Sequence, residues 1–417
     1  MQKAHFEAQW VYNYSLIKEN RLMKQDPIVI VSIARTPLGN LLGELKDFSA
    51  CQLGAHVIKT AMERAHLKPE DIQEVMMGCV LPAGQGQAPA RQAALYAGLP
   101  NHVPCTTVNK VCGSGMKTVM FAHDMLLANS ADIILAGGME SMTNAPYLLK
   151  KARQGYRLGH GEVLDHLMLD GLEDAYEPGK AMGAFAEDTV KQYGFSRKQQ
   201  DQFAEGSFER AKKATHDNFF SLEIAPVLLK TKQGDKIFDK DEHPFSVNPE
   251  KIPHLPAVFA KDGTVTAGNS SSIADGAAAL VLMCLSQAEK RGLQPLVKII
   301  GHSSFAKAPR EFTSAPIGAI QKLMSRINWT VNEVDLFEIN EAFAVVPLVA
   351  MKELHLPYEK VNVHGGAIAL GHPIGASGAR VLVTLIAALK QKDLKRGLAS
   401  LCIGGGEATA MAVEVLY

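Results

Sequence analysis

Cys112 is the residue whose surroundings best suit a nucleophile. It is followed by Gly113-Ser114-Gly115 and then by a helical pattern that begins at Met116. A sulfur at the amino end of a helix faces unpaired N–H groups and the positive end of the helix dipole, and both favour the thiolate. The thiolate is the form of cysteine that attacks a carbonyl carbon. The same pattern also fits a small buried residue in a tight turn, because free cysteines often pack in cores.

A nucleophilic thiol needs a group that takes its proton, and His372 is the strongest candidate among the 14 histidines. It lies in a glycine-rich loop, and Pro373 directly after it disfavours helical geometry, so we expect a side chain presented from a loop. His364 is a second candidate slightly earlier in the chain. The glycines could instead cradle a phosphate, but their spacing matches neither GxGxxG nor GxxxxGK[ST].

Two further polar segments follow strand-like runs. Cys402 ends an apolar run just before Gly404-Gly405-Gly406. Its thiol could transfer protons, and the glycine N–H groups could stabilise a developing oxyanion, although a core cysteine fits the same pattern. Asn340-Glu341 also follows a strand-like run, and polar groups on such connections often line sites.

Strand-like and helical patterns alternate through the chain, which indicates an α/β fold with largely buried sheets. The predicted strands are 28–32, 74–80, 133–136, 279–283, 297–300, 336–339, 399–403 and 410–415. The predicted helices include 50–65, 116–128, 317–327, 345–353 and 377–391.

Two segments run through the same order of elements, which indicates an internal duplication. In the first, Gly113-Ser114-Gly115 opens a helix, and a strand then leads into Gly137-Gly138-Met139-Glu140. In the second, Gly375-Ala376-Ser377-Gly378 opens a helix, and a strand leads into Gly404-Gly405-Gly406-Glu407. Chance likeness between glycine-rich turns is the alternative explanation.

The duplication divides the chain into predicted units. The N-terminal half covers residues 25–145 plus 265–295, and the C-terminal half covers residues 296–417. Residues 146–264, which are richer in Gly, Pro and charge, are expected to form an inserted loop domain that caps the core. Residues 1–24 fit no downstream pattern and are expected to be a non-structural extension, with an atypical targeting segment as the alternative.

Composition argues against several kinds of partner. The 417 residues carry 43 Lys and Arg against 43 Asp and Glu, so there is no net field to attract nucleic acid. The longest apolar run, 381–389, is about half of the roughly 20 residues that a membrane span needs. The 6 cysteines show neither disulfide density nor a CxxC metal spacing. We therefore expect reduced thiols, no metal and a cytoplasmic protein, or a mitochondrial one if residues 1–24 are a targeting segment.

In their residues and in their order, these blocks resemble the thiolase family along nearly the whole chain from 28 to 416. The stretch from Val108 to Lys117 resembles the nucleophile signature of that family. Asn340-Glu341-Ala342-Phe343-Ala344, the His372 loop and the Cys402 loop resemble its other three catalytic blocks. Supporting matches are the segments 34–37, 84–87, 90–93, 137–142 and 264–269.

The resemblance implies a duplicated thiolase fold, a five-layer α/β/α/β/α core with an inserted loop domain, assembled as a homodimer or homotetramer. It also implies roles. Cys112 would carry the acyl group, His372 would activate that thiol, and Cys402 would act as acid and base. One oxyanion hole would consist of His372 and a water held by Asn340. The other would consist of the N–H groups of Cys112 and Gly404.

The resemblance further implies that acyl-CoA and CoA are bound as substrates, with no other cofactor. The implied CoA contacts are Ser271 on the pantetheine arm, with Ala267, Phe259, Leu172, Met182, Ala342 and Phe343 as lining. Three positions depart from the family pattern. Ala181 replaces a His that biosynthetic acetoacetyl-CoA thiolases generally carry, Phe245 replaces a common Arg, and Ser272 replaces a common Gly. These departures leave the acyl chain length open.

The implied activity is that of an acetyl-CoA C-acetyltransferase, which condenses acetyl-CoA with an acyl-CoA or cleaves a 3-oxoacyl-CoA with CoA. A catalytically silent acyl-CoA-binding protein is one alternative, but it would lack one of the four catalytic residues. A decarboxylating ketosynthase would use two histidines after the cysteine. A cysteine hydrolase would not condense acetyl units. Whether synthesis or degradation dominates is left open by the sequence.

Overall fold

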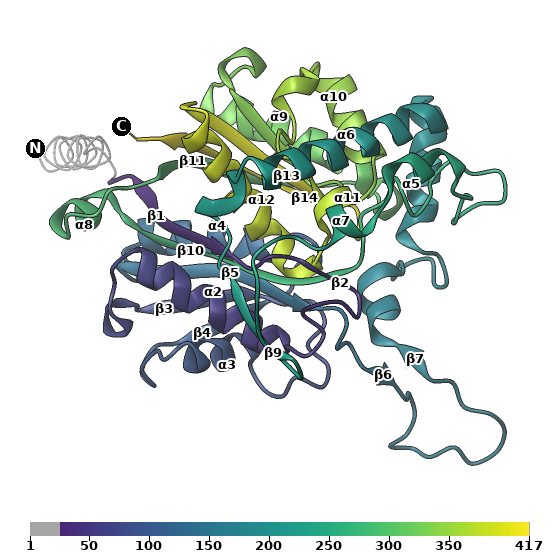
Figure 1. Cartoon of the computed structure of the whole chain (residues 1–417), viewed down its shortest axis with the longest axis horizontal. Coiled ribbons are helices and arrows are strands. Elements are labelled where there is room, and N and C mark those ends of the chain that lie inside the picture. The colour runs from purple at the N-terminus through teal and green to yellow at the C-terminus, as the bar shows by residue number, and fades with distance from the viewer. Residues whose placement is uncertain (1–25, 417) are drawn as a thin grey trace, which may run out of the picture.

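The structure is a computed structural model that describes residues 26–416, so the predicted extension at 1–24 lies outside the described residues. One continuous sheet dominates it (Figure 1). The sheet is covered by helices on both faces, and in strand β1 all eight residues are buried as a result. The strands of this sheet are β1 (Ile28–Arg35), β2 (Gly39–Asn40), β3 (Glu74–Gly78), β4 (Cys105–Val108), β5 (Ile133–Ser141), β10 (Ala274–Cys284), β11 (Val297–Ala306), β12 (Leu336–Ile339), β13 (Arg396–Ile403) and β14 (Glu407–Val415).

The strand order reveals the duplication. It reads β12-β13-β14-β11-β1-β10-β5-β3-β4, with β2 beside β10. From the centre outward, β1, β10, β5 and β3 pair antiparallel, antiparallel and parallel, and β11, β14, β13 and β12 repeat that sequence. The two halves join through only two β1–β11 residue pairs, Val29 with Lys298 and Ile30 with Val297. The duplicated fold is thus confirmed. The boundaries of the predicted domains remain a prediction.

Two helices form the middle layer between the halves of the sheet. The apolar faces of α4 (Ser114–Leu127) and α12 (Ile374–Gln391) share one core with β1, β10, β13 and β14. By length and composition α12 could cross a membrane, but 89% of it is buried inside the fold, as is typical of a core helix.

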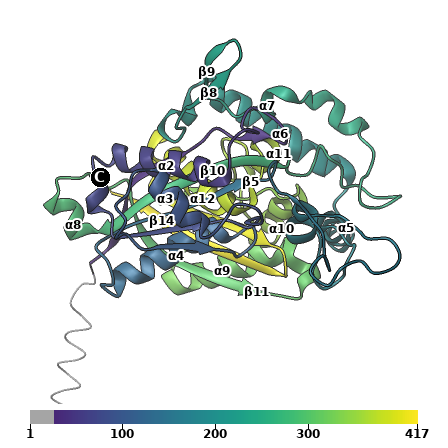
Figure 2. The ribbon, with the colours of Figure 1, turned by 90° about the horizontal axis from the view of Figure 1, so that it is seen from below.

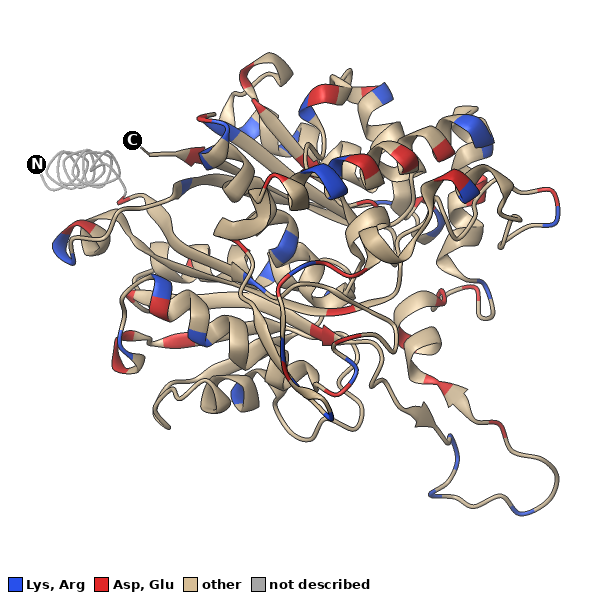
Figure 3. Cartoon of the chain, in the orientation of Figure 1, with Lys and Arg blue, Asp and Glu red and all other residues tan. Residues whose placement is uncertain are grey.

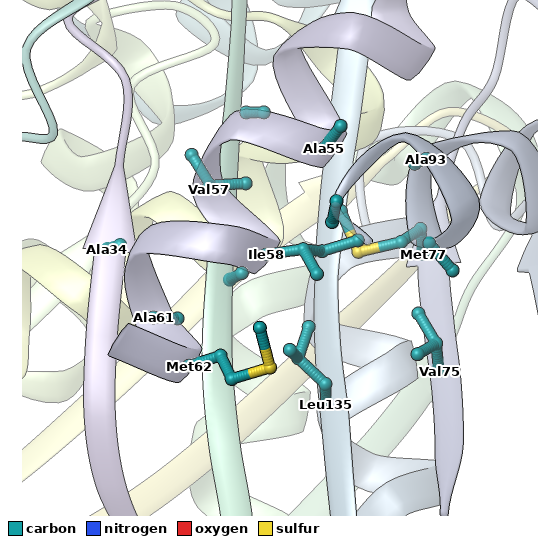
Figure 4. Packing of buried hydrophobic residues seen from close by; sticks show 14 of the residues in the cluster. Ala34, Ala55, Val57, Ile58, Ala61, Met62, Val75, Met77, Ala93 and Leu135 are labelled. Atoms are coloured by element: carbon teal, nitrogen blue, oxygen red, sulfur yellow. The ribbon is translucent and has the colours of Figure 1, made fainter. Parts of the chain in front are cut away.

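The outer faces of the sheet carry one helical layer each. Helices α2 (Ala50–Arg64) and α3 (Pro89–Tyr96) pack on the N-terminal half, where Ile58 and Met62 meet side chains of β3 and β5 (Figure 4). A capping box between Ser49 and Gln52 sets the start of α2. Helices α9 (Ala315–Ile327) and α10 (Val345–Leu354) cover the C-terminal half. The predicted five layers are therefore confirmed.

Glycines let the two middle helices cross closely. A Cβ at Gly115 would lie 2.7 Å from the backbone nitrogen of Ala379, and a Cβ at Gly378 would collide with the backbone of Met116. Helix α4 begins two residues after Cys112, and α12 begins two residues after His372. The crossing therefore brings the turns that carry Cys112 and His372 to neighbouring positions.

The insertion between the halves is folded. In it, α6 begins at Arg197 as predicted but ends at His216 rather than at Phe219. Its hairpin β8–β9 and helices α6 and α7 lie together on one side of the molecule (Figure 2), and the β6–β7 connection projects as an arm (Figure 1). The elements are β6 (Tyr147–Leu148), β7 (Leu164–Asp165), the π-helix η2 (Met168–Leu172), α5 (Met182–Tyr193), α6 (Arg197–His216), η3 (Phe219–Leu222), β8 (Val227–Thr231), β9 (Gly234–Phe238), α7 (His243–Ser246) and η4 (Pro249–His254).

Acidic and basic residues are interspersed along most of the chain (Figure 3). The strand predicted at 133–136 is too short: β5 continues through Gly137-Gly138-Met139-Glu140 to Ser141. The two glycines lie where β10 and α12 approach too closely for side chains. The remaining elements are η1 (Pro69–Asp71), α8 (Leu285–Lys290), η5 (Pro309–Ser314), η6 (Val331–Glu333), η7 (Tyr358–Lys360) and α11 (Ala367–Leu370).

Candidate active site

Cys112 stands on a strained turn between β4 and α4. Its predecessor Val111 has a φ of 46°, in the left-handed region where a β-branched residue costs roughly 1–3 kcal/mol. Hydrogen bonds hold the turn in place. The Val111 N–H donates to Oδ1 of Asn109 at 2.9 Å, and the Ser114 hydroxyl donates to the Val111 carbonyl at 2.7 Å. The turn is therefore fixed by its own side chains, and it presents Cys112 at the start of α4.

Burial acts against ionisation of the Cys112 thiol. Burial raises its pKa to about 11, and the backbone N–H groups of Gly404 and of Cys112 itself, directed at the sulfur, oppose that rise. Burial therefore opposes the thiolate that the helix start favours. The same contacts bring the two N–H groups predicted for an oxyanion hole together at the sulfur.

Cys402 is the second thiol of the site. It is buried at the end of β13, and its pKa is raised, first by burial and then by the charge that Cys112 would carry. The two sulfurs therefore lie close enough to influence each other's ionisation. Next to them, a Cβ at Gly404 would lie 3.5 Å from the sulfur of Met182.

The hydrogen bonds of His372 define which of its nitrogens carries the proton. Its Nδ1 lies 2.6 Å from the Ser377 hydroxyl, which itself donates to the Pro373 carbonyl at 2.9 Å. A hydroxyl has one proton, so the Ser377 oxygen accepts from Nδ1–H, and Nε2 keeps its lone pair. Nε2 is buried without a hydrogen-bond partner among the described residues. Burial and the nearby Arg380 charge lower the His372 pKa to about 3. The ring is therefore a neutral base.

Asn340 is oriented by the same arginine. Nη2 of Arg380 lies 3.3 Å from Oδ1 of Asn340, and Nη1 donates to Glu338 at 2.8 Å. Since a guanidinium only donates, the amide oxygen must face Arg380 and the NH₂ group must face the other way. That NH₂ is buried with no partner in the described part of the chain. It is thus a free donor, as a site for a bound water requires.

The segment predicted to bind CoA lies between these blocks. The Ser271 N–H donates to the Ala342 carbonyl at 3.0 Å, and the His372 N–H donates to the carbonyl of Ser272 at 2.9 Å. The ring centroids of Phe259 and Phe343 lie 6.1 Å apart, in an edge-to-face arrangement. The structure therefore brings the Ser271 segment to both the His372 loop and the Asn340 block.

The other predicted lining residues have different surroundings. Leu172 packs in the apolar cluster that contains Cys112 and Ile374. Ala267 is exposed on the Ser271 loop. Of the departures, Phe245 is 57% exposed on α7.

Three residues of the site were not predicted from the sequence as functional. Ser377 and Arg380 lie on α12, and Arg380 carried a usable signal because it is a charge inside an otherwise apolar helix. Glu140 on β5 accepts from the backbone N–H groups of Val80 and Gly375, both at 2.9 Å. It therefore ties the N-terminal half to the first turn of α12.

Comparisons with known proteins agree with this geometry. The thiolase N-terminal domain matches residues 28–286, and the thiolase C-terminal domain matches residues 293–415. The chain is 48% identical over 389 residues to acetyl-CoA acetyltransferase of Cupriavidus necator, covering 93% of this chain and 99% of that protein. It is 47% identical over 403 residues to acetyl-CoA acetyltransferase 1 of Arabidopsis thaliana, covering 96% of this chain and 97% of that protein.

Solved structures agree as well. An acetyl-CoA acetyltransferase of Bacillus anthracis superposes with a TM-score of 0.91 at 40% identity, covering 94% of this chain and 99% of that one. A thiolase of Ascaris suum in complex with coenzyme A superposes with a TM-score of 0.88 at 39% identity, covering 94% and 100%. With both family domains matched and relatives aligned over nearly their full length, this chain belongs to the thiolase family and is an acyltransferase.

Proposed function

We propose that the chain is an acetyl-CoA C-acetyltransferase that works through an acetyl group carried on Cys112. One observation carries the proposal: the Cys112 sulfur faces two backbone N–H groups and lies near a second buried thiol, Cys402. A single thiol with a base would suffice for hydrolysis. A second thiol suits an enzyme that must also move a carbon-bound proton.

The first half-reaction loads the enzyme. The Cys112 thiol gives its proton to Nε2 of His372 as the sulfur attacks the thioester carbonyl of acetyl-CoA. The oxyanion is stabilised by the N–H groups of Cys112 and Gly404, whose removal one at a time typically costs about 10²–10³ in rate. The carbon–sulfur bond to CoA breaks, and CoA leaves with the proton from His372.

The second half-reaction forms the carbon–carbon bond. Cys402 passes its proton to the vacant Nε2 of His372, and its thiolate takes a proton from the methyl carbon of a second acetyl-CoA. The enolate oxygen is stabilised by His372 and by a water on the free amide NH₂ of Asn340. The carbanion attacks the acetyl group, the bond to Cys112 breaks, and His372 returns a proton to that sulfur. The reverse sequence cleaves a 3-oxoacyl-CoA.

CoA as the group carrier is supported by the relative solved with coenzyme A and by the relatives' names. An open pocket of about 570 Å³ near the site is lined by Lys180, Ala181 and Phe259, among others. Ala181 precedes Met182, whose sulfur lies near Gly404. We infer that the pantetheine arm enters through this pocket toward Cys112.

The test is turnover. Purified protein should consume acetoacetyl-CoA in the presence of CoA and release CoA from acetyl-CoA, and Cys112→Ala should abolish both. Cys284→Ala, which removes another partly exposed thiol, should retain both. Binding of acyl-CoA without turnover in the wild type would identify a silent relative instead. Substrates of roughly four to sixteen carbons would define the acyl length that the pocket admits.

We also propose a homodimer or homotetramer in a reducing compartment such as the cytoplasm. Strand β4 ends the sheet and leaves an edge on which a second copy can pair. The β6–β7 arm carries exposed apolar side chains, among them Leu149 and Leu158 at 52% and 100% exposure, that suit a further contact between copies. All six cysteines are free, which supports a reducing compartment.

A further inference from the structure

A second cluster of metal-ligating side chains lies far along α4 from the active site. His123 and Asp124 are on α4, and His302 is on β11. Oδ1 of Asp124 lies 3.0 Å from Nδ1 of His123 and 2.9 Å from Nε2 of His302. These three atoms all lie within 4.8 Å of one another, and no other such group of three occurs in residues 26–416.

We propose that this cluster is a binding site for one late first-row divalent cation, with Zn²⁺ as the preferred ion. Two imidazole nitrogens and one carboxylate oxygen form a donor set that Zn²⁺ favours. Ligand bonds of about 2.0 Å place donor atoms roughly 3.3 Å apart in a tetrahedral site. The two separations from Asp124 are close to that value, and the separation between the two imidazole nitrogens is at most 4.8 Å.

The surroundings fit a bound cation that keeps an open position. Both imidazoles are largely enclosed, with side-chain exposures of 13% for His123 and 14% for His302, while Asp124 is 55% exposed. The cluster lines an open pocket of about 550 Å³, which leaves room for a water as the fourth ligand.

The cation would join two layers of the fold. Helix α4 belongs to the middle layer and leads from the Cys112 turn, whereas β11 belongs to the C-terminal half of the sheet. His123 lies about 14 Å along α4 from Ser114, at 1.5 Å per residue. The site therefore would act on stability rather than on the reacting atoms, and it does not depend on the proposed function.

The chain offers a matched control. His216 and Asp217 form a similar pair, with Nδ1 and Oδ1 also 3.0 Å apart, but no second histidine among residues 26–416 completes it. Zn²⁺ and Co²⁺ binding should therefore be compared in the wild type, His302→Gln, Asp124→Asn and His216→Gln. Each protein is first treated with EDTA and desalted. Circular dichroism and thermal unfolding in EDTA establish that the variants are folded.

The wild type and His216→Gln should each bind one Zn²⁺ per chain, with a rise in melting temperature and visible d–d absorption from tetrahedral Co²⁺. His302→Gln and Asp124→Asn should weaken binding by at least about tenfold, because each removes a ligand. Two results would overturn the proposal. One is unchanged affinity in folded His302→Gln and Asp124→Asn. The other is a Co²⁺ spectrum dominated by thiolate charge transfer, which would place the metal on cysteines.

Discussion

The Ser377 hydroxyl fixes the proton of His372. The Ser377 hydroxyl donates its only proton to the Pro373 carbonyl, so it can only accept from Nδ1–H of His372, at 2.6 Å. Nε2 is therefore left as the base. The two residues lie at the start of α12, so the helix itself sets the tautomer. Ser377 is thus a positioning residue for the proton acceptor of the reaction.

Removing that hydroxyl should slow turnover without unfolding the protein. In Ser377→Ala the ring can take either tautomer, so kcat should fall by about tenfold or more, within the 10²–10⁴ range that proton transfer contributes. Steady-state kinetics with acetoacetyl-CoA and CoA measure it. Ser303→Ala is the matched control, because Ser303 is another buried hydroxyl that donates to a backbone carbonyl. Equal losses in both variants would mean that the effect is one of stability.

Asn340→Asp separates the two ends of the amide. The substitution keeps an oxygen toward Arg380 but replaces the free NH₂ with a second oxygen, so the donor for the oxyanion water is lost while the fold keeps its anchor. We expect kcat to fall by about 10²–10³ with unfolding midpoint in urea near that of the wild type. Near-normal kcat in Asn340→Asp would show that the NH₂ group does not stabilise the reaction.

The ionisation of Cys112 should be visible in its alkylation. Burial raises its pKa to about 11, and burial lowers that of His372 to about 3, so neither group titrates near neutrality. The thiolate is the deprotonated form, and its fraction rises about tenfold per pH unit below the pKa. Iodoacetamide inactivation should therefore accelerate steadily between about pH 6 and 9. A rate that is constant over this range would instead indicate a preformed thiolate–imidazolium pair.

The four catalytic blocks show what the sequence could and could not predict. The blocks around Cys112, His372, Cys402 and Asn340 are each visible locally, as a glycine-rich turn or a polar strand end, and the structure brings their surroundings together. The rise in the Cys112 pKa was not visible in the sequence, because the helix start can be read from neighbouring residues, whereas burial of the sulfur depends on segments far along the chain.

Hydrogen-bond partners were hidden for a similar reason. Ser377 is an ordinary small residue in a helical pattern, and its importance comes only from the path of the His372 loop. Strand β5 was predicted too short because Gly137 and Gly138 usually indicate a turn. In the fold they occur where β10 and α12 approach the strand too closely for side chains.

Glu140 should be needed for stability across the two halves. Its oxygens accept from the N–H groups of Val80, Leu81 and Gly375 and from the Cys79 thiol, so the ionised form fits although burial raises its pKa. Glu140→Gln sets an amide NH₂ against one of these donors and should cost about 1–3 kcal/mol in urea unfolding. Glu353→Gln, at an exposed position on α10, should cost within about 0.5 kcal/mol. Similar values for both would contradict this role.

The β6–β7 arm should determine oligomer size. It carries Leu149 and Leu158, which are 52% and 100% exposed in the single chain, so replacing both with serine should remove a contact between copies. For a wild type that is a homotetramer, we expect light scattering to report half its mass, with a dimer that pairs through β4 remaining. Turnover should persist, because the site residues come from other elements. The control replaces Leu228 and Ile237 on the β8–β9 hairpin, which are 52% and 65% exposed, and it should keep the wild-type mass. An unchanged mass in the arm variant would assign assembly to another surface.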